Sequence, residues 1–283
     1  MVYNTVTALE ANYIADLVQQ ALVEDIGSGD VTAELIAADA QAEATIVTRA
    51  DMVLCGQAFV NAVFATLDKS IEIQWYYQDG DQILADNTLC QLVGNTRKLL
   101  TGERTAINFL QMLSATATTT HDYVEQLKST KTRLLDTRKT IPLFRKAQKY
   151  AVYCGGGLNH RTGLYDAVLI KENHIISCGS LSNAVAQAKK LYPKKVINVE
   201  VENLQEFTLA LETLADVILL DNFSLAELRA AVKQNKQRKL LEASGTITLE
   251  NIASVAATGV DYVAIGSLTK NIQAIDLSMR LNG

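Results

Sequence analysis

The chain has 283 residues, a net charge of −5 and 48% hydrophobic residues, which suits one α/β barrel or two medium domains with a substantial core. The acidic balance, and the lack of a long basic helix or an aromatic-interleaved basic stripe, argue against nucleic acid as the main partner. No uninterrupted apolar stretch reaches about 18 residues, and the first residues lack a signal-peptide pattern. We therefore expect a cytoplasmic protein with no membrane partner.

The first part of the chain has the pattern of a mixed α+β unit. Apolar residues recur at three- and four-residue steps from Leu9 to Ile26, which predicts an amphipathic helix. Residues 42–93 alternate as strands do, with Asp79-Gly80 as a turn signal. A helix from Gly56 lies between these strands, and a long helix follows the last of them.

That long helix runs from about Thr96 to Ser129, with Arg104 near its start. From Thr132 onward, short apolar runs alternate with helical segments, which is typical of a parallel sheet. The runs end at Asp136, Lys171, Glu200, Asp221, Ser244 and Gly266. In α/β barrels the reacting groups lie at the carboxyl ends of the strands, so we expect one mouth to gather these residues.

A capping role for the next helix is the alternative explanation of Asp221 and Ser244. It is weaker for Lys171 and Glu200, because charged groups directly after an apolar run are seldom placed there for packing.

Cations concentrate in one short part of this acidic chain. Between Arg133 and Lys171 there are eight Lys or Arg residues against two acids. Focused positive potential in a cleft concentrates small anions. The pair Arg138-Lys139 and the pair His160-Arg161 are the candidates, since the fork of arginine suits carboxylates.

Three other cations, Arg145, Lys146 and Lys149, are predicted to lie on a solvated helix face. The four cysteines, Cys55, Cys90, Cys154 and Cys178, show no CxxC spacing and no nearby histidine pairing. Neither a disulfide framework nor a zinc site is therefore indicated, and we expect reduced thiols.

Two junctions late in the chain have the composition of phosphate sites. EASGT, Glu242–Thr246, precedes a helix expected to begin near Thr248, and Ile265–Lys270 offers a second junction one unit later. Exposed backbone N–H groups at such junctions bind phosphate. Glu200 and Asp221 end neighbouring runs and suit Mg²⁺. Glycosidase chemistry is the alternative for this carboxylate pair, but the basic surroundings favour the metal.

Several long motifs resemble the quinolinate phosphoribosyltransferase family: DTRKTIP, GGGLNHRTGLYDAVLIKENH, VEVENLQE, LLDNFS and EASGTITLENI. ALVEDIGSGDVTAELI and GERTAINFLQMLSATATTT also match, so the resemblance covers nearly the whole chain. The family transfers a phosphoribosyl group from phosphoribosyl pyrophosphate to quinolinate with decarboxylation. The products are nicotinate mononucleotide, pyrophosphate and CO₂, on the route to NAD.

The resemblance implies an α/β protein with two domains. An N-terminal α+β domain, an α/β sandwich, would span residues 1–112, with residues 270–283 available to pack back on it. A C-terminal incomplete α/β barrel would span residues 113–283. The family also implies a homodimer, or a higher oligomer, whose active sites borrow residues from the partner chain.

Site roles follow from the same resemblance. Arg138, His160, Arg161 and Lys171 would face quinolinate, and Arg104 would reach in from the other subunit.

The phosphoribosyl pyrophosphate end carries the remaining roles. Lys139 would lie toward the pyrophosphate, while Glu200 and Asp221 would hold the ribose hydroxyls and Mg²⁺. The contacts to the 5-phosphate would come from Ser244, Gly245 and Gly266. The expected catalytic residues are Lys139, Lys171, Glu200 and Asp221.

Three positions depart from the family pattern: Leu143, Ala115 and Thr246 stand where glycine is common. A backbone phosphate cradle tolerates Thr246 if its φ stays negative. Three other functions remain open. They are a molybdenum-transport-associated paralogue with a different acceptor, a Schiff-base aldolase using Lys171, and a non-catalytic phosphate-binding barrel.

Overall fold

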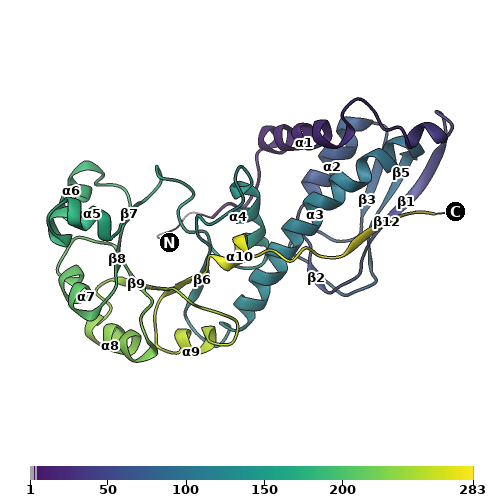
Figure 1. Ribbon diagram of the computed structural model, residues 1–283. Helices are drawn as coiled ribbons and strands as arrows, with labels where there is room; N and C mark the ends of the chain where they lie inside the picture. Colours follow the sequence, from purple (N-terminus) through teal and green to yellow (C-terminus); the bar gives the residue numbers. More distant parts are fainter. Residues whose placement is uncertain (1–2, 4, 283) are drawn as a thin grey trace. The chain divides into compact units, whose positions relative to one another are not determined.

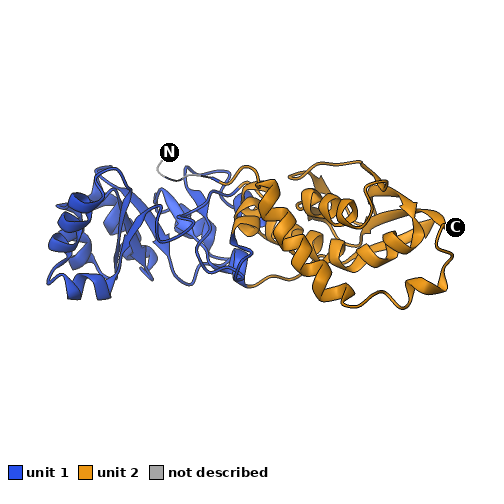
Figure 2. Ribbon diagram, turned by 90° about the horizontal axis from the view of Figure 1, so that it is seen from above, with its two compact units in different colours: residues 1–5, 122–145, 157–270 blue, residues 6–121, 146–156, 271–283 orange. Residues whose placement is uncertain are grey.

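The computed structural model describes residues 3 and 5–282, which form two compact units (Figures 1 and 2). Unit 1 holds residues 1–5, 122–145 and 157–270, and unit 2 holds residues 6–121, 146–156 and 271–283. The expected boundary at residue 112 falls inside helix α3, Thr96–Glu125. None of the described helices combines the length and the apolar character that crossing a bilayer requires.

Unit 2 is built on a four-stranded antiparallel sheet with the order β12-β1-β5-β3. Its strands are β12 Leu277–Asn282, β1 Gln41–Thr48, β5 Thr88–Asn95 and β3 Glu72–Trp75. A two-stranded ribbon joins β2 Met52–Val53 to β4 Gln82–Ile83, and the helices are α1 Ala11–Ile26, α2 Gln57–Leu67, most of α3, and most of α4 Arg145–Cys154. A short 3₁₀ helix, Ala33–Leu35, follows α1. The amphipathic helix, the Gly56 helix and the intervening strands are thus confirmed.

Periodicity explains how these elements pack. Strand β1 buries Ala44, Ile46 and Thr48 at the two-residue spacing of a half-buried strand. Helix α1 buries Ile14, Val18 and Leu22 at the four-residue spacing that places side chains on one helix face.

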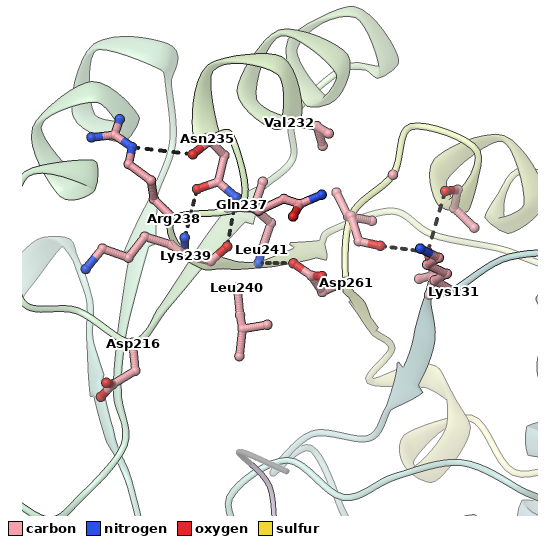
Figure 3. A pocket seen from close by; sticks show the side chains of 14 residues that line it. Lys131, Asp216, Val232, Asn235, Gln237, Arg238, Lys239, Leu240, Leu241 and Asp261 are labelled. Atoms are coloured by element: carbon pink, nitrogen blue, oxygen red, sulfur yellow. Dashed lines mark hydrogen bonds between the residues drawn. The ribbon is translucent and has the colours of Figure 1, made fainter.

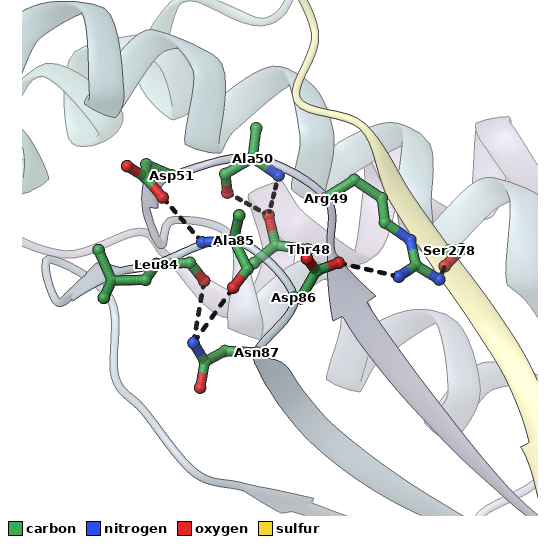
Figure 4. A network of polar contacts seen from close by, with 9 residues as sticks. All are labelled: Thr48, Arg49, Ala50, Asp51, Leu84, Ala85, Asp86, Asn87 and Ser278. Atoms are coloured by element: carbon green, nitrogen blue, oxygen red, sulfur yellow. Dashed lines mark hydrogen bonds and ion pairs between the residues drawn. The ribbon is translucent and has the colours of Figure 1, made fainter.

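The last strand of the chain is tied into unit 2 by a polar network (Figure 4). Arg49 Nη1 donates to Asp86 Oδ1 at 3.1 Å, and its Nη2 donates to Ser278 Oγ at 3.2 Å. Asp51 Oδ1 accepts from the Ala85 amide at 2.8 Å. Strand β12 is therefore held by side chains as well as by its ladder with β1.

Unit 1 contains a six-stranded parallel sheet with the order β6-β11-β10-β9-β8-β7. The strands are β6 Arg133–Leu135, β7 Val168–Ile170, β8 Ile197–Val201, β9 Val217–Asp221, β10 Leu240–Ser244 and β11 Tyr262–Ala264. Each predicted apolar run is one of these strands. Strands β6 and β7 form the two edges, so within the described residues the barrel is open, as expected.

Helices cover the outer face of this sheet (Figure 1). They are α5 Glu172–Ser177, α6 Leu181–Leu191, α7 Leu204–Leu211, α8 Leu225–Asn235, α9 Ile252–Ala256 and α10 Ser267–Lys270. Val199, Ile218 and Leu241 share a buried cluster with helix residues such as Phe207. Because both faces of the sheet are covered, its strands have continuous apolar runs instead of alternation.

At α7 and α8, helix capping comes from residues beyond the strand ends, whereas Lys171 is itself the N-cap of α5. Asn203 and Ser224 accept from the amides of Glu206 and Glu227 at the starts of α7 and α8. Capping therefore does not explain Glu200 or Asp221, which end the preceding strands. The helix expected near Thr248 begins later, at Ile252, because residues 248–251 form a turn in which the Thr248 amide donates to Asn251 Oδ1 at 2.9 Å.

Candidate active site

A cavity of about 250 Å³ lies at the carboxyl ends of the unit 1 strands. It gathers eight residues that the sequence analysis selected: Arg138, Lys139, His160, Arg161, Lys171, Glu200, Asp221 and Ser244. The strand register explains the convergence. Asp221 pairs with Ser244 across β9 and β10, while Glu200 and Glu242 both pair with Leu219 one level below. Parallel register therefore places these side chains on one face at two adjacent levels.

An ion pair joins two of the expected catalytic residues. Lys171 Nζ lies 2.6 Å from Glu200 Oε2, with side-chain exposures of 48% and 15%. Other acidic groups lie near this pair. The carboxylate of Glu172, followed by those of Glu206, Asp221 and Glu200, raises the pKa of the neighbouring Glu202. This rim therefore has the negative potential that attracts a divalent cation.

The opposite part of the cavity holds two guanidinium groups. Burial and the neighbouring Arg138 lower the pKa of Arg161. Arg161 Nη1 donates to the Ala167 carbonyl at 3.4 Å. Among the described residues, Arg138 Nε is buried and has no hydrogen-bond partner. A buried charged donor without an acceptor is costly, so this part of the cavity is suited to an anion.

Two acids inside unit 1 position the histidine. Asp136 is fully buried, and its carboxylate accepts from the His160 amide and from Asn159 Nδ2, each at 2.8 Å. Glu242 is also fully buried and lines the cavity, with Oε2 3.5 Å from His160 Nε2. Sequence reasoning included Glu242 only in the EASGT motif. A charge inside the apolar run LLEAS was the signal that could have identified it.

Arg145 has a role that the sequence did not predict. Its guanidinium donates to Thr140 Oγ1 at 3.0 Å, to the Thr162 carbonyl at 3.0 Å and to the Arg138 carbonyl at 3.4 Å. It therefore braces the loops that carry the Arg138 and Arg161 pairs, instead of lying on a solvated face.

The other two cations of that expected solvated face differ from each other. Lys149 is fully buried, so its prediction is wrong. Lys146 is partly exposed, which fits the prediction, and pairs with Glu10 at 3.2 Å.

The candidate phosphate end depends on close approaches at glycine. A Cβ on Gly245 would lie 2.0 Å from Asn222 Oδ1, and a Cβ on Gly266 would lie 2.8 Å from Lys139 Cδ. Thr246 has φ +47° and Leu143 has φ +64°. The condition of a negative φ at Thr246 is therefore not met, and both residues adopt the left-handed conformation that favours glycine.

Arg104 is not brought to this cavity. It belongs to unit 2, where it lines a separate cavity of about 300 Å³ with Asp25 and Asp30.

The cysteines contain one spatial cluster that their spacing does not reveal. Ligand atoms of Cys55, Asp79 and Cys154 lie within 4.8 Å of one another in unit 2. The Asp79 carboxylate accepts from the Gly56 amide at 3.0 Å and from the Tyr150 hydroxyl at 3.1 Å. Burial raises the pKa of both Asp79 and the Cys55 thiol. These contacts give Asp79 a structural role at the start of α2.

An open parallel barrel with cations, carboxylates and close-approach glycines at its strand ends defines an α/β-barrel protein built to bind small anions. The C-terminal and N-terminal domain models of quinolinate phosphoribosyl transferase match residues 116–280 and 30–114. The chain therefore belongs to the quinolinate phosphoribosyl transferase family.

Individual relatives agree with this assignment. A probable nicotinate-nucleotide pyrophosphorylase (carboxylating) of Bacillus subtilis is 38% identical over 93% of this chain and 91% of that protein. The nicotinate-nucleotide pyrophosphorylase (carboxylating) of Mycobacterium leprae is 36% identical over 94% of this chain and 96% of that protein. The solved nicotinate-nucleotide pyrophosphorylase of Francisella tularensis superposes with a TM-score of 0.97, at 48% identity and 99% coverage of each chain.

Proposed function

We propose that the protein transfers the phosphoribosyl group of phosphoribosyl pyrophosphate to quinolinate and releases CO₂, giving nicotinate mononucleotide and pyrophosphate. The observation that carries this proposal is a single cavity with Arg138, Arg161 and Lys171 on its walls and Glu200 and Asp221 at its rim. The cations suit a pyridine dicarboxylate, and the carboxylates suit a ribose donor.

The quinolinate end is assigned to the cations. The buried Arg138 Nε needs an acceptor that the described protein does not supply, and a substrate carboxylate is such an acceptor. Burial and the neighbouring Arg138 lower the pKa of Arg161, and a second substrate carboxylate would compensate the repulsion between the two guanidinium groups. Lys171 is held at the same mouth by Glu200.

The phosphoribosyl pyrophosphate end is assigned to Lys139 and to the loops after β10 and β11. Thr269 Oγ1 donates to the Lys139 carbonyl at 2.7 Å, which ties this lysine to the Gly266 loop. Ser244 ends β10 at the level of Asp221, and Gly245 follows it. Helices α9 and α10 are short, so backbone N–H groups and Lys139, more than helix dipoles, would hold the phosphates.

Glu200 and Asp221 fit Mg²⁺ in the form in which it accompanies a pyrophosphate. Two carboxylates on adjacent strands are too few for an all-protein cage, but Mg²⁺ is commonly held by one or two carboxylates plus phosphate oxygens. The acidic rim around Glu202 supports the same assignment. When bound, the ion would neutralise charge on the leaving pyrophosphate.

The residues would act on two steps. In the first, the pyridine nitrogen forms a bond to the anomeric carbon while the bond from that carbon to pyrophosphate breaks. The electron pair of the broken bond leaves with the pyrophosphate. Glu200 and Asp221 stabilise the positive charge that develops on the ribose, and Lys139 stabilises the departing anion.

In the second step, CO₂ leaves the carbon beside the ring nitrogen. The bonding electrons remain on that carbon beside the cationic nitrogen, and a proton then replaces the carboxyl group. Arg138 and Arg161 orient the ring so that only one carboxylate is lost.

We also propose a homodimer in which Arg104 completes the partner's site. Its support is that Arg104 lies on α3 of unit 2 in a motif that the family resemblance assigns to quinolinate, while the barrel cavity is lined by unit 1 residues.

Release of pyrophosphate and CO₂ with quinolinate tests the function, with nicotinate as the control acceptor. Turnover of quinolinate but not nicotinate supports the proposal, and binding of phosphoribosyl pyrophosphate without release of either product contradicts it.

The Schiff-base alternative is disfavoured, because an ammonium in a 2.6 Å ion pair with Glu200 is not a nucleophile. Borohydride trapping of a carbonyl substrate on Lys171 would revive it.

A further inference from the structure

A tyrosine near the start of the chain packs against the strands of unit 1. Tyr3 is 7% exposed and packs with Leu135, Val217 and Ala264. Its ring centroid lies 4.9 Å from that of His160, at a 38° tilt.

The hydroxyl of Tyr3 meets two groups far away in the sequence. It lies 2.7 Å from Glu242 Oε2 and 2.9 Å from Asn198 Oδ1. Asn198 Nδ2 donates to the Val168 carbonyl at 3.0 Å, which fixes the orientation of its amide. Burial and the Glu242 carboxylate raise the pKa of the Tyr3 phenol, so the phenol keeps its proton and remains a donor.

The contacts of His160 determine where its ring proton lies. The Arg161 amide donates to His160 Nδ1 at 2.7 Å, so Nδ1 is an acceptor. The proton of the neutral ring is therefore on Nε2, which faces Glu242 Oε2 at 3.5 Å. The sequence of contacts Tyr3–Glu242–His160–Arg161 thus connects the buried N-terminal tyrosine to an arginine of the cavity.

The other oxygen of Glu242 marks this carboxylate as part of a binding site. Among the described residues, Glu242 Oε1 is fully buried and lacks a hydrogen-bond partner, and Glu242 lines the cavity together with Arg138. A half-satisfied buried carboxylate is destabilising, and packing alone would favour an apolar residue here. The position of Glu242 in the middle of an apolar strand therefore indicates a role in the site.

We propose that Glu242 and Tyr3 are positioning residues for the quinolinate half of the site: through the imidazole of His160 they hold the backbone that presents Arg161. This rests on the proposed function. Removing the Tyr3 hydroxyl leaves Glu242 without its donor, frees the His160 ring and loosens Arg161. The phosphoribosyl pyrophosphate end, which lies on other loops, is unaffected.

The kinetic test compares Tyr3→Phe and Glu242→Gln with Tyr262→Phe in the full-length protein. Tyr262 is the matched control, because its ring lies edge-on to that of Tyr3 with centroids 5.3 Å apart. Within the described residues, no hydrogen bond joins its hydroxyl to Glu242 or His160. We expect Tyr3→Phe and Glu242→Gln each to raise KM for quinolinate by about tenfold, the effect of losing one charge-assisted hydrogen bond. KM for phosphoribosyl pyrophosphate should stay within about twofold in all three variants.

Equal changes in both KM values, or a wild-type KM for quinolinate in Tyr3→Phe, would overturn the inference. The double variant sharpens this test, because residues acting along one path give less than additive effects.

A second measurement separates this inference from the proposed function. The chain has three histidines, so ¹⁵N spectra of histidine-labelled protein can resolve the tautomer of His160. The wild type should show a protonated Nε2, and Tyr3→Phe should shift the His160 signals while those of His121 and His174 stay in place. Unchanged His160 signals in both variants overturn the positioning role even if the enzyme is inactive with quinolinate. Inactivity of the wild type with altered His160 signals refutes only the proposed function.

Discussion

The two ends of the unit 1 barrel differ in how their polar groups are satisfied. The larger cavity, about 660 Å³, lies at the amino ends of the strands (Figure 3). There, Lys239 Nζ donates to the Thr213 and Ala215 carbonyls at 2.8 Å each, and Asp261 Oδ2 accepts from the Leu241 amide at 2.8 Å. The smaller cavity at the carboxyl ends contains Arg138 Nε and Glu242 Oε1, which have no hydrogen-bond partner among residues 3 and 5–282. Unsatisfied buried polar groups identify a ligand site better than volume does.

The largest effect should come from disrupting the carboxyl-end site that we propose two chains share. Lys171→Ala and Arg104→Ala should each lower activity by about 10²-fold or more, because each removes a charge aimed at the reacting substrate. Mixing the two inactive variants should restore part of the activity through hybrid dimers. A mixture that stays inactive, although both variants fold and exchange subunits, removes the support for a shared site.

Removal of Mg²⁺ should have the next largest effect. With a chelator present, turnover should fall by about 10²-fold, since the proposed ion would supply several kcal/mol of charge stabilisation on the leaving pyrophosphate. Equilibrium binding of quinolinate should change little, because its proposed contacts are Arg138, Arg161 and Lys171. Full turnover in the chelator would refute the metal role of Glu200 and Asp221.

A matched pair of arginines compares the two ends directly. Arg138→Ala should weaken quinolinate binding by about one to two powers of ten, the effect of losing a charge-assisted hydrogen bond. Arg238→Ala, at the other end, removes a surface ion pair with Glu212 at 2.9 Å and a hydrogen bond to the Asn235 carbonyl at 3.4 Å, and it should leave quinolinate binding unchanged. Isothermal titration of both variants measures this contrast, and equal losses would contradict it.

The smallest effect concerns backbone strain in one loop at each end. Thr246 (φ +47°) and Gln237 (φ +61°) both adopt the left-handed conformation. Thr246→Gly and Gln237→Gly should each relieve about 1 kcal/mol of strain, partly offset by the greater entropy of glycine in the unfolded chain. We expect the free energy of unfolding, measured by thermal unfolding, to rise by up to about 0.5 kcal/mol for each variant. Only Thr246→Gly should alter KM for phosphoribosyl pyrophosphate, and a change with Gln237→Gly would contradict the assignment.

Local patterns in the sequence were sufficient for the elements and for most of the site. Apolar runs located the six strands of the parallel sheet, and three of the charged residues that end them, Lys171, Glu200 and Asp221, line one cavity. These features depend on neighbours in the chain: a run buried on both faces must be apolar, and the first polar residues after it must lie at the strand end.

Tertiary structure alone decided the features that depend on distant residues. Nothing local in the first residues indicates that Tyr3 enters the barrel and meets Glu242, 239 positions away. Composition also did not distinguish the buried Lys149, or Arg145 with its contacts to the loops, from the partly exposed Lys146. The reason is physical: a charge can be buried only where partners from other segments converge, and that convergence exists only after folding.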